Sequence, residues 1–268
     1  MGDGLRLYLR FVAVSLRAQL QYRASVIMQA LGLLLITVIE YVGVWALFER
    51  FGHIGGWTLP QVALLYGMVD VAFALSETIG RGFDAFPSMV TSGDFDRLLV
   101  RPRSTVLQLL GQELALRRLG RLVQGVAVLI WAATVLPIAW SPGKLLLLLA
   151  AIGGGVCLFI GLSIVQATIA FWTVEPLEFM NAFTHGGVET GHYPLTVYRS
   201  WFRKLFTFVI PLACVNYLPA MAILDMHPAG APGAQLARWL APLGGVLFLL
   251  ASLQLWKLGV RKYVSTGS

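Results

Sequence analysis

Long apolar runs separated by short polar segments dominate this chain. A helix needs about 20 apolar residues to cross the roughly 30 Å of hydrocarbon in a bilayer. Six runs meet that length: Ala24–Phe48, Leu59–Ile79, Leu122–Trp140, Leu145–Val174, Leu205–Leu224 and Ala237–Trp256. The pattern predicts an all-α integral membrane protein of six transmembrane helices, folded as a single domain over residues 1–268.

Two of these runs depart from a plain apolar pattern. The run from Leu145 is long enough to tilt, or to end in a bend near Gly153–Gly155. The run from Leu59 is the weakest of the six because Asp70 and Glu77 interrupt it.

The composition supports a membrane location. Hydrophobic residues make up 57% of the chain and charged residues 12%, and the mean hydropathy is +0.76. A soluble domain carries about 25% charged residues. Because a soluble protein of this size could not bury so much apolar surface, soluble enzyme folds are excluded. Cys157 and Cys214 each lie in an apolar run, where they act as small apolar residues, so we expect no disulfide framework.

The basic residues predict the orientation. With the amino terminus in the cytoplasm, all of the 20 Lys and Arg residues except Arg50, Lys144 and Arg238 fall in segments placed inside. Such an asymmetry is typical of cytoplasmic loops. Both termini are therefore predicted to be cytoplasmic, with residues 80–121 and 175–204 as cytoplasmic loops. The net charge of +7 is explained by this topology, so we expect no nucleic-acid partner.

The amino-terminal segment is amphipathic. Apolar side chains at helical spacing share one face, and Arg6, Arg10 and Arg17 lie on another; the apolar positions are Leu5, Leu9, Val12, Leu16 and Leu20. This pattern predicts an interfacial helix on the cytoplasmic leaflet. The alternative is an irregular start to the first span.

Motifs for catalysis are not apparent in the sequence. It contains no G-x-x-x-x-G-K-[ST] phosphate loop, and its four histidines form no i,i+4 pair. We therefore predict no catalytic residue, no metal site and no cofactor bound by this chain. His185, Glu189 and His192 could form a polar cluster at one interface, and the alternative is ordinary loop polarity.

Two carboxylates fall deep inside predicted spans, whereas Glu77 lies near the cytoplasmic end of the second span. Asp70 lies near the middle of the second span and Glu40 lies in the first. A carboxylate at bilayer depth must face protein or water because its burial in lipid is costly. Tyr66 and Phe73 share a helical face with Asp70 and could cradle a cation. One hypothesis makes Glu40, Tyr66, Asp70 and Phe73 a substrate pathway; the other makes the carboxylates hydrogen-bonded locks between helices.

The cytoplasmic segment Gly82–Pro102 is the most informative stretch. Its apolar start predicts a short helix closed by Gly93, which can adopt a left-handed cap. A polar turn follows, and then Leu98 and Leu99 precede an Arg101-Pro102 break that begins a new helix. The segment is predicted to form a helix–turn–helix knuckle between the second and third spans.

This segment resembles the permease subunits of ABC-2 type transporters. Members of that family carry a G-x-x-D-x-L-L-x-x-P run between the second and third spans, matched here by Gly93, Asp96, Leu98, Leu99 and Pro102. Further family-like stretches are residues 192–198, 208–211 and 217–220. The resemblance covers nearly the whole chain and is nearest to the six-span, viologen-exporter-like branch.

The resemblance implies a permease half in the bacterial cytoplasmic (inner) membrane. Its partners would be membrane lipid, a second six-span permease, identical or related, and two ATP-binding cassette ATPase subunits that bind ATP and Mg. A coupling helix would dock on the ATPase through Gly93, Asp94, Phe95, Asp96, Arg97, Leu98, Leu99, Arg101 and Pro102.

The implied function is ATP-driven export of an amphipathic or cationic compound, or of a lipid. Three alternatives remain open: an ATP-independent carrier or channel, a permease-like regulatory or scaffold component of an envelope process, and a membrane enzyme. The knuckle itself could also be no more than a solvated loop.

Overall fold

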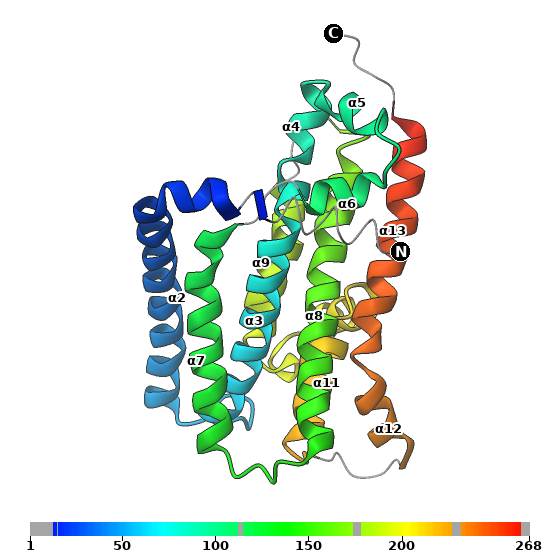
Figure 1. Cartoon of the computed structure of the whole chain (residues 1–268). Helices are drawn as coiled ribbons and strands as arrows, with labels where there is room; N and C mark the ends of the chain where they lie inside the picture. The colour runs from blue at the N-terminus through cyan, green and yellow to red at the C-terminus, as the bar shows by residue number, and fades with distance from the viewer. Residues whose placement is uncertain (1–12, 15, 112–114, 174–177, 227–231, 264–268) are drawn as a thin grey trace.

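The structure, a computed structural model, describes residues 13–14, 16–111, 115–173, 178–226 and 232–263. These residues form a bundle in which the long helices run roughly side by side (Figure 1). An isolated β-bridge, Ile54 to Trp57, lies in the turn between the first two long helices. The predicted all-α class is confirmed.

Among the residues that the structure describes, four helices are long and apolar enough to cross a membrane: α2 (Arg23–Phe51), α3 (Leu59–Asp84), α8 (Pro142–Ile169) and α13 (Leu243–Lys262). A bent pair of shorter helices would make a fifth span if it crossed as one unit. The shorter apolar helix α7 (Leu119–Val135) follows a 3-10 turn, η1 (Leu116–Arg118). The short helices α4 (Phe86–Thr91), α5 (Asp94–Leu99) and α6 (Thr105–Leu110) cluster at one end of the bundle, the knuckle end (Figure 1).

The first two spans are confirmed at their starts. Helix α3 begins with a capping box at Thr58. In this motif the Thr58 N–H donates a 2.9 Å hydrogen bond to Gln61 Oε1 in the first turn. The helix then continues five residues beyond the predicted end at Ile79, to Asp84. The end of the bundle that holds the α2–α3 turn is called the turn end below.

The third and fourth spans differ from their predicted bounds. We predicted that the third would reach Trp140, but α7 ends at Val135, because Leu136 precedes Pro137 and adopts an extended conformation with ψ of 137°. The fourth begins three residues early at Pro142, where the Ser141 hydroxyl accepts from the Lys144 N–H at 3.2 Å, and it ends at Ile169 instead of Val174.

The predicted fifth span, Leu205–Leu224, is not a single straight helix. The chain from Ser200 to Ile223 forms two arms bent by 81°. The first arm is α10 (Ser200–Lys204) with η3 (Leu205–Val209), and the second is η4 (Ala213–Tyr217) with α11 (Leu218–Ile223). The break falls at Pro211, which lacks an N–H donor and holds Ile210 extended with φ of −113°.

The two arms form a hairpin that enters and leaves at the turn end. Before the hairpin, Val197 in η2 (Leu195–Val197) lies beside the α2–α3 turn, where a Cβ placed on Gly55 would be 3.2 Å from Val197 Cγ2. After the hairpin, Asp225 Oδ2 is 2.6 Å from the Nζ of Lys144 in the first turn of α8. Because both contacts lie at the turn end, the hairpin does not connect the two ends of the bundle.

A segment predicted as cytoplasmic loop makes that connection instead. Helix α9 (Glu178–Gly191) lies alongside α3 (Figure 1). His185 of α9 lines a cavity with Asp84 near the knuckle end, whereas His192, just past the helix, contacts Asp70 halfway along α3. The described part of residues 175–204 is therefore not simply a loop, since it includes a helix packed along α3.

The last predicted span is shifted toward the carboxyl terminus. A separate helix, α12 (Pro232–Leu240), precedes α13, and the break at Ala241-Pro242 moves the helix start from Ala237 to Leu243. Helix α8 is continuous through Gly153–Gly155 and approaches the start of α13 closely: a Cβ on Gly154 would lie 2.5 Å from the Pro242 carbonyl oxygen.

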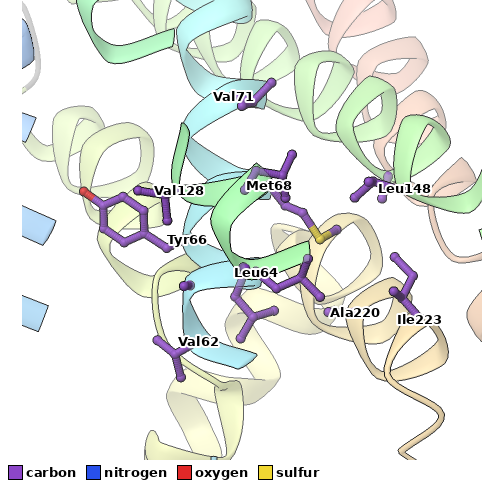
Figure 2. Close-up of a cluster of buried hydrophobic side chains, with 14 of the residues drawn as sticks. Val62, Leu64, Tyr66, Met68, Val71, Val128, Leu148, Ala220 and Ile223 are labelled. Atoms are coloured by element: carbon purple, nitrogen blue, oxygen red, sulfur yellow. The ribbon is translucent and has the colours of Figure 1, made fainter. Parts of the chain in front are cut away.

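Helix α3 is the centre of the bundle. Every residue from Val62 to Asp70 is buried, and α3 packs on both α7 and α8. Figure 2 shows Met68 pointing toward Leu148 of α8 and Ile223 of α11, with Tyr66 on the opposite side. The span that looked weakest in the sequence is therefore the most buried one, since its carboxylates require protein partners.

The amino-terminal helix is described in part. Residues 13–14 and 16–21 are helical and lie across the end of α2 (Figure 1). Gln19 Oε1 accepts a 3.2 Å hydrogen bond from the Leu116 N–H. Leu5, Leu9 and Val12 lie outside the described residues, so the interfacial placement stays a prediction.

Candidate functional site

The knuckle is built as predicted around Gly93 but differs in its second half. Gly93 adopts φ of +75° between α4 and α5, a conformation that favours glycine. The expected polar turn after Gly93 is instead helix α5, which carries Asp94 and Asp96 in its first turn. Pro102 does not begin a helix; α6 begins at Thr105, and the Gln108 side chain donates to the Leu98 and Arg103 carbonyls at 3.1 and 3.2 Å.

An aromatic cluster ties the knuckle to the bundle. Phe95 of α5 is fully buried and lies 5.0 Å from both the Phe86 and Tyr263 ring centroids. Phe86 in turn lies 4.8 Å from Trp256 of α13. Edge-to-face aromatic pairs add about 0.5–1.5 kcal/mol each beyond their area burial. The full cluster spans α3, α4, α5, α13 and the segments after α8 and α13: Phe83, Phe86, Phe95, Phe171, Trp256 and Tyr263.

The predicted coupling residues therefore fall into two groups. Phe95 and Leu98 face the bundle and are buried. Arg97 has a side chain that is 82% exposed, with a 3.2 Å ion pair to Asp94, and Leu99 and Arg101 are exposed as well. The exposed face thus belongs to a helix whose inner face is packed, through the aromatic cluster, against α3 and α13.

A second polar site lies inside the bundle, next to α3. Asp70 is 1% exposed, and its Oδ1 lies 3.1 Å from His192 Nε2. The other imidazole nitrogen, Nδ1, lies 3.6 Å from Glu189 Oε2. The imidazole of His192 thus lies between two carboxylates and contacts one oxygen of each, while Asp70 Oδ2 is buried without a hydrogen-bond partner among the described residues. Asn216 of η4 donates a 2.7 Å hydrogen bond to the Gly191 carbonyl, which holds the end of α9 in place.

The four predicted substrate-pathway residues all face internal partners. Tyr66 stacks on His192 with ring centroids 4.0 Å apart. The Arg121 guanidinium lies 5.2 Å from the Phe73 ring centroid and 3.8 Å from Glu40. In this conformation, the side chains of His192 and Arg121 therefore lie where a cationic substrate was expected.

A polar cavity of about 300 Å³ opens toward this site from the knuckle end, between α3, α8 and α9. It is lined by Phe73, His185 and two acidic side chains, Glu77 and Asp84. Glu77 forms a 2.7 Å ion pair with Arg118 at the cavity wall. The cavity thus reaches within one helical turn of Asp70.

Sequence reasoning did not connect His192, Glu189 or Arg121 with Asp70. It grouped the first two with His185, as a polar cluster or ordinary loop polarity, and used Arg121 only to predict the topology. The available signal was the pair of intramembrane carboxylates, because each of them requires a basic or hydrogen-bonding partner from another segment. Among the described residues, no group of three or more His, Cys, Asp and Glu side chains is arranged to hold a metal ion.

Comparison with known proteins gives one match. A family model described as "ABC-2 family transporter protein" matches residues 34–267. No curated protein and no solved structure matches the chain.

Proposed function

Because the chain belongs to the ABC-2 transporter family, we propose that it is the permease half of an ATP-driven exporter. The permease carries no nucleotide itself and works with two ATP-binding cassette ATPase subunits that bind ATP and Mg, and with a second permease, identical or related. The cargo is an amphipathic or cationic compound, or a lipid, moved out of a bacterial cell across its cytoplasmic membrane.

The observation that supports coupling to an ATPase is the two-sided character of α5. Its inner face is held in the aromatic cluster through Phe95, and its outer face presents Arg97 and Leu99. When the ATPases close on ATP, a rigid helix wedged against them passes the displacement to α3 and α13. A merely solvated loop would not require a fully buried phenylalanine.

The proposed permease has six transmembrane spans, and its fifth span is α9, not Leu205–Leu224. The six are α2, α3, α7, α8, α9 and α13. Helix α7 has 17 residues, about 25 Å at 1.5 Å per residue, which is near the lower limit for crossing. Helix α9 has 14 residues and is preceded by residues 174–177, outside the described part. The bent pair of arms then enters the membrane from the external side and returns to it.

We place the knuckle end in the cytoplasm, with both termini on that side. Arg97, Arg101 and Arg103 lie in the knuckle, and Lys257 and Arg261 lie in the last turns of α13. The knuckle end therefore still carries an excess of basic residues when α9 is counted as a span, as the positive-inside rule requires of the cytoplasmic side. The revised path moves Arg199, Arg203 and Lys204 to the arm that begins at the turn end.

The substrate-pathway hypothesis for Glu40, Tyr66, Asp70 and Phe73 now has a condition. The aromatic and acidic groups that would bind a cation already have partners in the protein. His192 contacts Tyr66 and Asp70, and Arg121 lies over the Phe73 ring. A substrate could contact Asp70 only after α9 moved away from α3. We propose that such a movement accompanies transport.

Purification of the tagged chain from its native host tests the proposed function. We expect an ATP-binding cassette ATPase to copurify in a 1:1 ratio and its ATP hydrolysis to rise with candidate cationic or amphipathic compounds. Transport without any copurifying ATPase would favour the carrier alternative. A stoichiometric ATPase that no compound stimulates, in a complex that exports none, would favour the scaffold alternative.

A further inference from the structure

A cavity of about 620 Å³ lies between α6, α8 and α13, on the side of the bundle away from the polar site. Its walls are mostly aliphatic and include Ile160 and Ile164 of α8 and Leu249, Leu250 and Leu253 of α13. The volume falls in the range typical of ligand sites. No residue of the cavity belongs to the outer face of α5 or to the polar cluster around Asp70.

The cavity is polar at one end only. Lys257, Gln254 and Ser104 line it there, and all three are exposed. Lys257 lies eight residues beyond Leu249, so the charged end and the deepest aliphatic wall are about 12 Å apart along α13. Arg261 follows Lys257 by four residues and therefore lies on the same face of the helix, which adds a second positive charge.

From this arrangement we infer that the cavity binds an anionic phospholipid of the leaflet at the knuckle end. One acyl chain lies along the aliphatic walls, and the phosphate lies at Lys257. A basic pocket between transmembrane helices on the cytoplasmic side suits such a headgroup. Charge complementarity favours a lipid over an apolar helix of a partner, because a buried partner helix would leave Lys257 desolvated without a counter-charge.

The site also contacts the coupling apparatus. Trp256 lines the cavity and belongs to the aromatic cluster, and its Nε1 donates a 3.0 Å hydrogen bond to Thr105 of α6. A bound lipid would fill the space between α6 and α13 next to this bond. It would therefore stabilise the attachment of the knuckle to α13 without touching the ATPase-facing residues.

Native mass spectrometry of the full chain, with any copurified subunits, tests this inference. The probes are phosphatidylglycerol, phosphatidylcholine and the soluble headgroup glycerol 3-phosphate. We expect phosphatidylglycerol to be retained about fivefold better than phosphatidylcholine, the factor for one lysine near a headgroup, and glycerol phosphate not to be retained. Lys257→Gln should remove most of that preference, whereas Lys262→Gln, at the same end but outside the cavity lining, should keep it.

A second pair of variants tests the acyl-chain position. Leu250 lines the cavity, and Leu247, one turn away on α13, does not. Both side chains are more than half exposed, so a tryptophan at either position does not displace buried side chains. Leu250→Trp should lower the number of retained lipids, and Leu247→Trp should not.

Equal phosphatidylglycerol preference in wild type and Lys257→Gln would overturn the headgroup assignment. Equal lipid retention in both tryptophan variants would overturn the site, and retention of glycerol phosphate alone would identify a simple phosphate site.

Discussion

Asp70 and His192 are 122 residues apart in the chain, and their side chains meet inside the bundle with Oδ1 and Nε2 3.1 Å apart. This contact fixes α9 against α3. It turns an intramembrane carboxylate, which alone would be costly in lipid, into half of an internal pair. It also means that the most conspicuous charge in the sequence has a structural partner.

Replacing one member of this pair should destabilise the protein. Asp70→Asn or His192→Leu leaves a buried polar partner without its counter-charge, a loss of about 3–5 kcal/mol for buried pairs. Thermal melting of the purified protein in detergent should show a clear fall for each variant. The double variant should recover part of the loss, because neither charge then remains unpaired.

Glu189→Gln is the matched control for that series. Its carboxylate is also near His192, at 3.6 Å, but its side chain is 64% exposed. We expect a loss of stability below about 1 kcal/mol, as for exposed ion pairs.

A different result for Asp70→Asn would support the cation site. If this variant melted at the wild-type temperature and lost only the export of cationic compounds, Asp70 would act on the substrate and not mainly as a structural partner of His192.

The two faces of α5 should respond differently to substitution. Phe95→Ala removes a fully buried ring from the aromatic cluster and should cost about 3–5 kcal/mol of stability. Transport-linked ATP hydrolysis should fall in the variant that remains in the membrane, because the knuckle is no longer rigidly attached.

Arg97→Glu, unlike Phe95→Ala, should weaken ATPase binding without lowering the stability of the protein. The side chain is 82% exposed, so thermal stability should change little, while copurification of the ATPase should fall. Both properties are read from one purification followed by a melt. Full ATPase association and full transport-linked hydrolysis in Arg97→Glu would contradict the coupling assignment.

The path of α9 predicts a labelling pattern that differs from the loop prediction. In a background without Cys157 and Cys214, cysteines at Val197 and His53 should both react with an impermeant thiol reagent added outside intact cells. Both residues are exposed, and both lie at the turn end. Ser92→Cys, in the knuckle, should react only after permeabilisation. Labelling of Val197→Cys together with Ser92→Cys would restore residues 175–204 as a cytoplasmic loop.

The close approach of α8 and α13 predicts unequal effects of two neighbouring glycines. A Cβ at Gly154 would lie 2.5 Å from the Pro242 carbonyl oxygen, whereas nothing lies within 4 Å of a Cβ at Gly153. Gly154→Ala should therefore destabilise the protein by about 1–3 kcal/mol through overpacking. Gly153→Ala should be neutral or slightly stabilising, since alanine favours the helix. Thermal melting compares the two, and equal effects would contradict the close packing.

Local sequence determined much of this protein. Apolar length placed α2, α3, α8 and α13, because crossing hydrocarbon needs a long uninterrupted helix. The spacing from Gly93 to Pro102 indicated the ABC-2 family before any coordinates, and the left-handed turn at Gly93 followed from its missing side chain. These features depend only on the order of residues within one segment.

Only the tertiary structure decided which apolar segments connect the two ends of the bundle. Leu205–Leu224 is apolar enough for a span, but Pro211 breaks it and Lys144 holds its far end beside the start of α8. Helix α9 is polar enough to look like a loop, yet His192 finds its partner in Asp70. A hydrophobicity pattern reflects the free energy of placing each residue in lipid. A polar residue that contacts a partner inside the protein is not exposed to lipid, so this free energy does not apply to it. That partner comes from a distant part of the chain, so its position is known only once the helices are packed.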